Sequence, residues 1–174
     1  VVRPNYQQIA LDICDFFVAH QFENGNLGRA WRNNGECAAT DGATGSFLIP
    51  AFLIAYQITR DATYLRAAER AFHFYMDGLL TNGFTAAGAL DTHCIDKESS
   101  IPLLRAGLTL YEITGDAQYL NWSEQTAYYL ASWQWHHSVE YEAGTALHDL
   151  AYETFGGTSV STQHHHQDPY GLSF

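Results

Sequence analysis

The sequence predicts an all-α protein built from helical hairpins, and three observations support that fold class. The chain matches itself when it is shifted by 55 positions, apolar residues in the matched segments recur at helical spacing, and short turns alternate with long loops. With 174 residues, 47% of them apolar and 16% charged, the composition is that of one globular domain. We therefore expect a single domain over 1–174, with hairpin repeats at about 45–98 and 99–155.

The repeat is clearest around one turn and the helices on either side of it. The segment LIPAFLIAYQITRDATYLRAAE, residues 48–69, aligns with LLRAGLTLYEITGDAQYLNWSE, residues 103–124, and half of the aligned residues are identical. Self-similarity at a fixed period of this size indicates that the chain repeats one supersecondary unit.

Five helices are expected in order along the chain. The first covers 4–22 and resembles an outer helix that precedes the first full repeat. In each repeat the first helix, at 45–59 or 99–114, is apolar on nearly every side, which is typical of a helix buried between two layers. The second helix, at 62–78 or 117–133, has an apolar stripe opposite charged residues, which predicts one face in water.

The turn inside each hairpin is short and contains a capping residue. It is TRDA in the first repeat and TGDA in the second. Asp61 and Asp116 stand immediately before the second helix of their repeats, and aspartate is among the preferred N-cap residues. We expect both carboxylates to accept a hydrogen bond from the first turn of the following helix.

The link from one hairpin to the next is a loop of about twenty residues that is rich in glycine and in functional side chains. Connections between packed helices are usually about two to eight residues long, and longer loops in compact domains tend to be functional. The long loops are therefore the places where a binding or catalytic site is expected.

The alternating helices, the TGDAxYL turn and the one-sided long loops resemble the six-hairpin glycosidases, whose fold is an (α/α)6 toroid. Two segments carry the resemblance in particular: DTHCIDKESSIPLLRAGLTLYEITGD, residues 91–116, and FGGTSVSTQHHHQDPYG, residues 155–171. The resemblance implies a toroid with the substrate at its loop-rich mouth. Six units of this length would need roughly 330 residues, so this chain would form about half of an (α/α)6 barrel.

Half a ring would leave apolar inner helices and two cut edges in contact with water. We therefore expect either the remainder of a parent chain or another copy of this chain, in a homo-oligomer, to complete the toroid. The sequence starts Val-Val-Arg-Pro without a methionine, which favours a fragment of a longer chain. The resemblance also favours export, into the periplasm or out of the cell.

Paired carboxylates are the catalytic groups that the resemblance calls for. Under the 55-residue shift Asp41 aligns with Asp96, each just before the first helix of a repeat. Packed helices lie about 8–10 Å apart, so the two carboxylates would fall within the ~6.5–9.5 Å separation of an inverting glycosidase, one as acid and one activating water. Glu98 is the alternative second carboxylate, with Lys97 as an ion-pair partner for one of its neighbours. The competing interpretation is that both aspartates only cap their helices.

Several side chains in the loops are candidates for contact with a sugar. Arg29 would clamp a carboxylate, and Trp31 would stack on a sugar ring. His93 lies beside the acidic motif. Trp133 and Trp135 are expected on different faces, one in the core and one, Trp135, at the mouth of the site.

Three consecutive histidines, His164, His165 and His166, stand in the last loop. On a helix they would spread over about 200°, so one metal ion is not expected to bind all three. Hydrogen bonds to sugar hydroxyls or proton transfer are favoured, with pairing to the inner helices as the alternative. The three cysteines are widely spaced and form no Cys-x-x-Cys pair, so neither a metal nor another cofactor is expected.

The charge balance narrows the class of partner. Eight Lys and Arg residues against nineteen Asp and Glu give a formal net charge of −11, which disfavours nucleic acid because phosphate neutralisation dominates that affinity. No apolar run reaches the length of a membrane span. The expected partner is therefore an oligosaccharide or polysaccharide.

Together these observations predict a glycoside hydrolase that cleaves glycosidic bonds with paired carboxylates. One alternative is a polysaccharide lyase or an epimerase with a His or Tyr base beside a uronate, which a basic cleft would favour. The other is a non-catalytic half-toroid that binds carbohydrate or has a structural role.

Overall fold

A computed structural model describes residues 4–86, 94–162 and 167–168, and most of them are helical. The helices are α1 (Pro4–Ala19), α2 (Ile49–Thr59), α3 (Ala62–Asn82), α4 (Ser100–Thr114), α5 (Ala117–Ala131) and the short α6 (Ala146–Asp149), with a 3-10 helix, η1 (Thr44–Leu48), leading into α2. Short strands pair inside the long loops: β1 (Ala30–Trp31) with β2 (Cys37–Ala39), β3 (Thr85–Ala86) with β4 (Ile95–Asp96), and β5 (Thr158–Ser159) with β6 (Gln167–Asp168).

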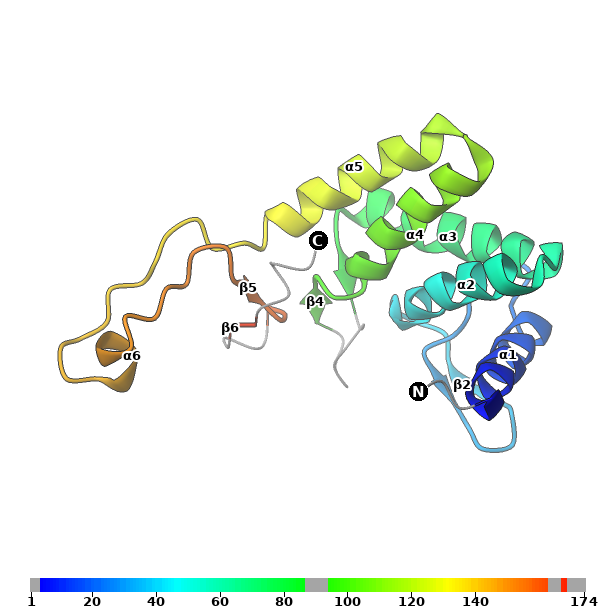
Figure 1. The fold of residues 1–174 in the computed structure, drawn as a ribbon, viewed down its shortest axis with the longest axis horizontal. Coiled ribbons are helices and arrows are strands. Elements are labelled where there is room, and N and C mark those ends of the chain that lie inside the picture. The colour runs from blue at the N-terminus through cyan, green and yellow to red at the C-terminus, as the bar shows by residue number, and fades with distance from the viewer. Residues whose placement is uncertain (1–3, 87–93, 163–166, 169–174) are drawn as a thin grey trace.

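The five long helices form a layered array of hairpins (Figure 1). α2 packs against α4, α3 contacts both of them, α5 packs on α4, and α1 lies against α2 and α3. α2 and α4 are the first helices of the two repeats and α3 and α5 the second helices, in the order that the sequence predicts. The all-α class is confirmed, and the predicted helices agree with the observed ones to within a few residues at most ends.

The two short turns have the same geometry because their sequences repeat. Asp61 and Asp116 each have φ −76° and ψ 112°, and their side chains accept hydrogen bonds from the backbone N–H of Thr63 and Gln118 at 2.8 and 2.9 Å. The predicted caps are therefore confirmed. The preceding helix ends in each case on a left-handed residue, which is Gly115 in the second repeat.

The core lies where α2, α3 and α4 meet. Its largest fully buried apolar side chains include Phe52, Leu53, Phe72, Met76, Leu103 and Leu110. Two glycines allow the close packing: a Cβ on Gly45 would lie 1.9 Å from the Tyr75 hydroxyl oxygen, and one on Gly107 would lie 2.3 Å from Ser123 Oγ.

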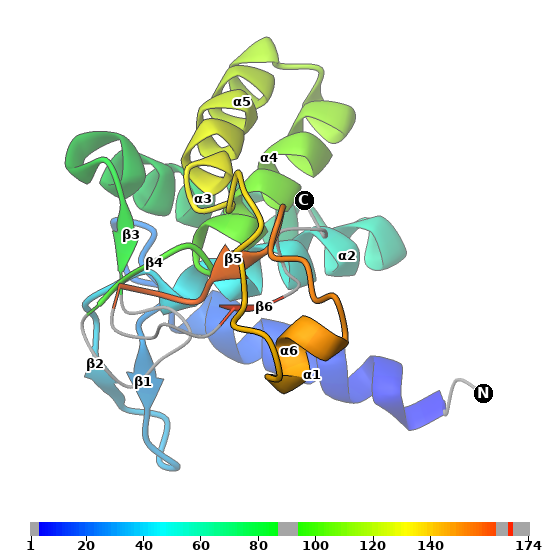
Figure 2. The same ribbon diagram turned by 90° about the vertical axis from the view of Figure 1, so that its left-hand side faces the viewer.

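The long loops meet one another through backbone hydrogen bonds. The Ala43 N–H donates to the Ala86 carbonyl at 2.9 Å, which joins the first loop to the second. The Thr162 N–H donates to the Ile95 carbonyl at 3.0 Å, which joins the third loop to the second. Because the links inside the hairpins are tight turns at the other end of the helices, the long loops share one end of the array, on the side that Figure 2 presents.

After α5 the chain continues as a long loop. Residues 132–157 contain one four-residue helix, α6, and otherwise run as irregular backbone that extends away from the helical array (Figure 1). In the described ranges no further long helix follows α5, so the second unit is one hairpin followed by a long arm. The same ranges contain no helix with the length and apolar character of a membrane span.

Candidate functional site

A hollow of about 380 Å³ lies at the loop-rich end, where the third loop folds back past the end of α5. We call it the tryptophan hollow. The described residues that line it are Ser132, Trp133, Gln134, Trp135, His136, His137, Ser159, Ser161 and Thr162. Two indole rings, two imidazole rings and several hydroxyl groups therefore surround one concave surface.

Backbone pairing holds the tryptophan hollow in shape. Trp135 N–H donates to the Gly157 carbonyl at 2.9 Å, and Gly156 N–H donates to the Trp135 carbonyl at 2.8 Å. Gln134 and Thr158 form an antiparallel bridge beside them. These bonds place the segment that follows α5 against β5, so residues far apart in the sequence line the same hollow.

The indole rings are oriented by other aromatic side chains. Trp135 meets His137 edge to face, with ring centroids 5.7 Å apart, and Trp133 meets Tyr129 of α5 in the same way at 6.2 Å. Both tryptophans are half-buried. The prediction that one of them belongs to the core is therefore wrong: the chain turns after α5, and both rings line the hollow.

β4 lies next to the tryptophan hollow and carries the first of the predicted carboxylates. Asp96 forms an antiparallel bridge with Ser161, which lines the hollow. The Asp96 side chain is fully buried, and its Oδ1 accepts a hydrogen bond from the Ser99 N–H at 3.1 Å, just ahead of α4. This contact closes the turn before α4 and is not an N-cap bond, because the N-cap residue of α4 is Ser99, whose side chain makes no capping hydrogen bond.

The Asp96 backbone is also fixed. Its carbonyl accepts hydrogen bonds from the Tyr129 hydroxyl at 2.6 Å and from Thr85 Oγ1 at 2.8 Å. Burial raises the pKa of Tyr129, so its phenol stays protonated as the donor. These contacts attach β4 to α5 and to β3 and hold the acidic loop rigidly at the end of α4.

A buried ion pair follows Asp96 in the sequence. The Lys97 side chain is fully buried, and its Nζ lies 3.8 Å from Oε1 of Glu98, as predicted for a salt partner of a neighbouring residue. The Glu98 side chain is 14% exposed. Of the two carboxylates on this loop, Glu98 is therefore the one that reaches solvent.

Asp41, the third of the predicted catalytic carboxylates, is on the surface. Its side chain is 43% exposed and forms an ion pair with Arg29, with Oδ2 and Nε 3.2 Å apart. The guanidinium group that was predicted to clamp a substrate carboxylate is thus paired with a carboxylate of its own chain.

The two aspartate loops are neighbours. Ala43 bonds to Ala86, and Ala86 pairs with Ile95. Adjacent strands are about 4.8 Å apart, so two such steps separate Ala43 from Ile95 by about 10 Å. The premise that equivalent positions of the two hairpins lie at one end of the array agrees with this pairing, although Asp41 faces solvent and Asp96 the interior.

Trp31 has a packing role in the structure. Its Nε1–H donates to the Leu27 carbonyl at 3.0 Å, and its ring meets Phe16, Phe17 and His20 of α1 with centroid distances of 5.4 to 5.7 Å. The indole covers one side of α1 and does not line the tryptophan hollow.

The remaining predicted residues, His93, His164, His165 and His166, lie outside the described residues. Among the residues that are described, no group of three or more His, Cys, Asp or Glu side chains is arranged to hold a metal ion.

The sequence did not identify His136, His137, Ser159 and Ser161 as site residues. The aromatic run WQWHH, residues 133–137, indicated that these histidines could belong to a site. The positions of Ser159 and Ser161 opposite this run depend on the β-pairing of the third loop.

Comparison of the chain with protein-family models, with curated proteins and with solved structures finds no match.

Proposed function

We propose that this chain binds an oligosaccharide in the tryptophan hollow, as a glycoside-hydrolase-like protein of the (α/α)-toroid type. The observation that carries the proposal is the meeting of Trp133, Trp135, His136 and His137 around one hollow at the loop-rich end. Indole rings offer flat apolar faces to the C–H surface of a sugar ring. Imidazole nitrogens and serine hydroxyls supply donors and acceptors for sugar hydroxyls.

The lining favours a neutral sugar. None of the described residues that line the tryptophan hollow is Lys or Arg. A uronate would need such a cation beside its carboxylate. For that reason we favour a protein that acts on neutral glycans over a polysaccharide lyase or an epimerase.

We propose glycosidic hydrolysis as the reaction, with Asp41, Asp96 and Glu98 as its carboxylates in distinct roles. Glu98 reaches solvent beside the buried Lys97, and Asp41 is exposed on the neighbouring loop. These two would contact the substrate, one as acid and one activating water. The buried Asp96 would be a positioning residue that fixes the loop through Ser99. The non-catalytic alternative is favoured by the same ion pairs, because each of these two carboxylates already has a cationic partner in its own chain.

Trp135→Ala tests the binding proposal. Loss of one stacking ring should weaken the affinity for a neutral oligosaccharide by roughly ten- to a hundredfold, from about 1–3 kcal/mol of contact energy. Isothermal titration of a set of neutral oligosaccharides measures the change. Trp31→Phe is the matched control, because Trp31 packs on α1, and it should leave the affinity unchanged. Equal affinities for the wild type and Trp135→Ala would contradict the proposal.

The carboxylates are tested separately from binding. We expect Glu98→Gln and Asp41→Asn each to reduce the rate of reducing-sugar release by at least about a hundredfold, while binding in the tryptophan hollow persists. The control is Glu124→Gln, an exposed carboxylate on α5. If the variant that combines Glu98→Gln and Asp41→Asn still hydrolyses the substrate, these two carboxylates are not catalytic. Binding without any hydrolysis in the wild type would establish the non-catalytic alternative.

The apolar surface of α2 and α4 supports the toroid proposal. Ile54 is 56% exposed, and Ile58 and Leu108 are also exposed. Exposed apolar residues gathered on neighbouring elements mark a surface that a partner covers. We propose that the remainder of a parent chain or a second copy of this chain covers it. The mass in solution distinguishes the two: a multiple of the 19.5 kDa of this chain indicates a second copy.

A further inference from the structure

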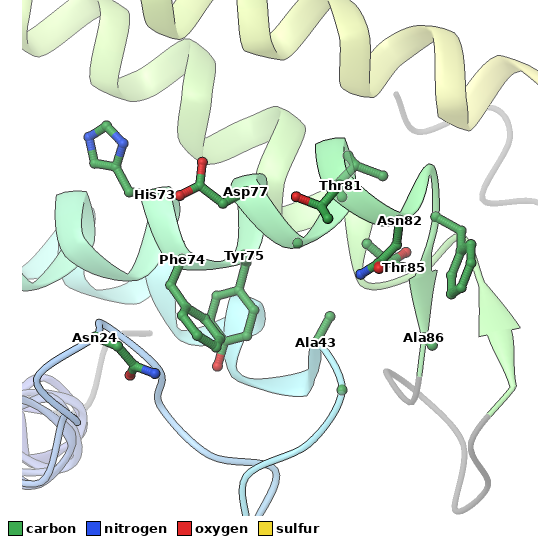
Figure 3. Close-up of a pocket in the computed structure, with 14 residues that line it drawn as sticks. Asn24, Ala43, His73, Phe74, Tyr75, Asp77, Thr81, Asn82, Thr85 and Ala86 are labelled. Atoms are coloured by element: carbon green, nitrogen blue, oxygen red, sulfur yellow. The ribbon is translucent and has the colours of Figure 1, made fainter.

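We propose that a second hollow, on the outer side of α3, binds an organic cation: an ammonium group carried on a small apolar body. This α3 groove has a volume of about 680 Å³ and lies between the C-terminal half of α3, the loop at Gly42 and Ala43, and β3 (Figure 3). Volumes of a few hundred Å³ are typical of small-molecule sites. The α3 groove shares no described lining residue with the tryptophan hollow, and the inference does not depend on the proposed carbohydrate binding.

Gly78 forms part of the lining of the α3 groove and is not explained by the fold. It stands inside α3, where glycine stabilises a helix less than alanine does. It does not have the positive φ that favours glycine, and a Cβ built on it meets no described atom within 4 Å. Gly45 and Gly107 differ, because a Cβ at either position would clash with a neighbouring side chain. Gly78 thus keeps open a space that no described side chain fills.

The charges along the α3 groove favour a cation. Asp77 lies beside Gly78, is exposed, and pairs with no cationic group in the described part of the chain. The C-terminal end of α3, at Asn82, adds the partial negative charge of its free carbonyl groups. The described lining contains no Lys or Arg, although His73 lies at one edge, where its ring packs against Trp122.

Aromatic side chains in the α3 groove favour a cation as well. Phe74 and Phe84 both line it. An ammonium group over the face of an aromatic ring is attracted by the ring quadrupole, and quaternary ammonium ligands are recognised in this way. Asn24 and Thr81 supply neutral polar groups at the rim. The carboxylate, the helix terminus and the rings therefore attract the same kind of ligand.

Choline and 3,3-dimethylbutan-1-ol test the proposal, because the two have the same shape and only choline is charged. In a two-dimensional NMR titration of the whole chain, choline should shift the amide signals of Gly78, Thr81 and Asn82. The neutral analogue should bind at least about tenfold more weakly. Equal binding of both probes would overturn the proposal, as would the absence of shifts at about 50 mM choline, where even weak ligands of this size bind.

Variants of α3 make the test specific. Asp77→Asn should weaken choline binding at least about tenfold, while Glu69→Gln, on the same helix but outside the α3 groove, should leave it unchanged. Gly78→Leu should fill the space and abolish the shifts, with the amide spectrum reporting whether the variant folds. Unchanged choline affinity in Asp77→Asn would overturn the proposal. None of these variants alters the tryptophan hollow, so oligosaccharide binding should persist in all of them.

Discussion

At the scale of single residues, the acidic loop before α4 shows why the role of an aspartate could not be predicted from its position in the sequence alone. Asp96 precedes a helix, which is where both a capping carboxylate and a catalytic carboxylate of a toroid would stand. The structure buries its side chain against the Ser99 N–H and buries Lys97 beside Glu98. Burial of charged groups costs free energy unless they are paired. The neighbouring opposite charges in the motif are therefore part of what keeps this loop folded.

The repeated turn gives a prediction for stability. Asp116→Ala should lower the free energy of unfolding by about 1 kcal/mol, because the Gln118 N–H loses its capping acceptor. Asp61→Ala should act in the same direction at the equivalent turn. The hydrogen bond from Thr63 also lowers the pKa of Asp61. Urea unfolding measures both variants, and an unchanged midpoint would show that these caps do not contribute.

Tyr75 gives a prediction for alkaline pH. Burial raises its pKa to about 12, whereas an unfolded tyrosine titrates near 10. Between about pH 10 and 12 the folded chain keeps a proton that the unfolded chain has lost, so stability falls as the pH rises. Tyr64 and Tyr119 add to the same slope, since their pKa values are also raised to about 12.

Tyr75→Phe separates that contribution from the others. The variant should lose stability near neutral pH, because the Leu27 N–H donates to the Tyr75 hydroxyl and that hydroxyl donates to Asn26. It should also show a shallower decline above about pH 10. Chemical unfolding over that pH range measures the slope, and identical slopes in the variant and the wild type would rule out the assigned cause.

At the scale of elements, the helices could be predicted because their apolar residues recur at helical spacing and because the second helix of each repeat follows a turn with a capping aspartate. The strands could not, since two or three residues form no pattern of their own. Their positions depend on contacts between distant segments, such as the bond from Ala43 to Ala86 and that from Thr162 to Ile95. For the same reason the sequence named Trp135 as a site residue but missed the serines opposite it.

Alanine substitutions at two helical glycines should change the stability of the fold in opposite directions. Gly78→Ala should raise the free energy of unfolding by about 0.5–1 kcal/mol, since the methyl group meets open space and alanine is the better helix former. Gly107→Ala should lower it by about 1–3 kcal/mol, because its Cβ would lie 2.3 Å from Ser123 Oγ. Thermal unfolding compares the two. A loss of stability in Gly78→Ala would mean that the fold itself requires this glycine.

At the scale of the whole molecule, the long loops meet at one end of the helical array and the tight turns lie at the other. The tryptophan hollow is at the loop-rich end, beside the strand that carries Asp96. The sequence predicted this end as the site from the lengths of the connections alone. It also predicted that a loop would follow the fifth helix, but not that residues 132–157 would extend away from the helical array.

The central claim is that a neutral oligosaccharide binds in the tryptophan hollow, and the most direct measurement is an NMR titration that maps where the sugar binds. Addition of a neutral oligosaccharide should shift the indole N–H signals of Trp133 and Trp135 together with the amide signals of Ser159 and Ser161. The indole signal of Trp31, which is bonded to Leu27, should stay in place. The claim would be contradicted if other signals shifted while the indole signals of Trp133 and Trp135 did not, or if no neutral oligosaccharide shifted any signal.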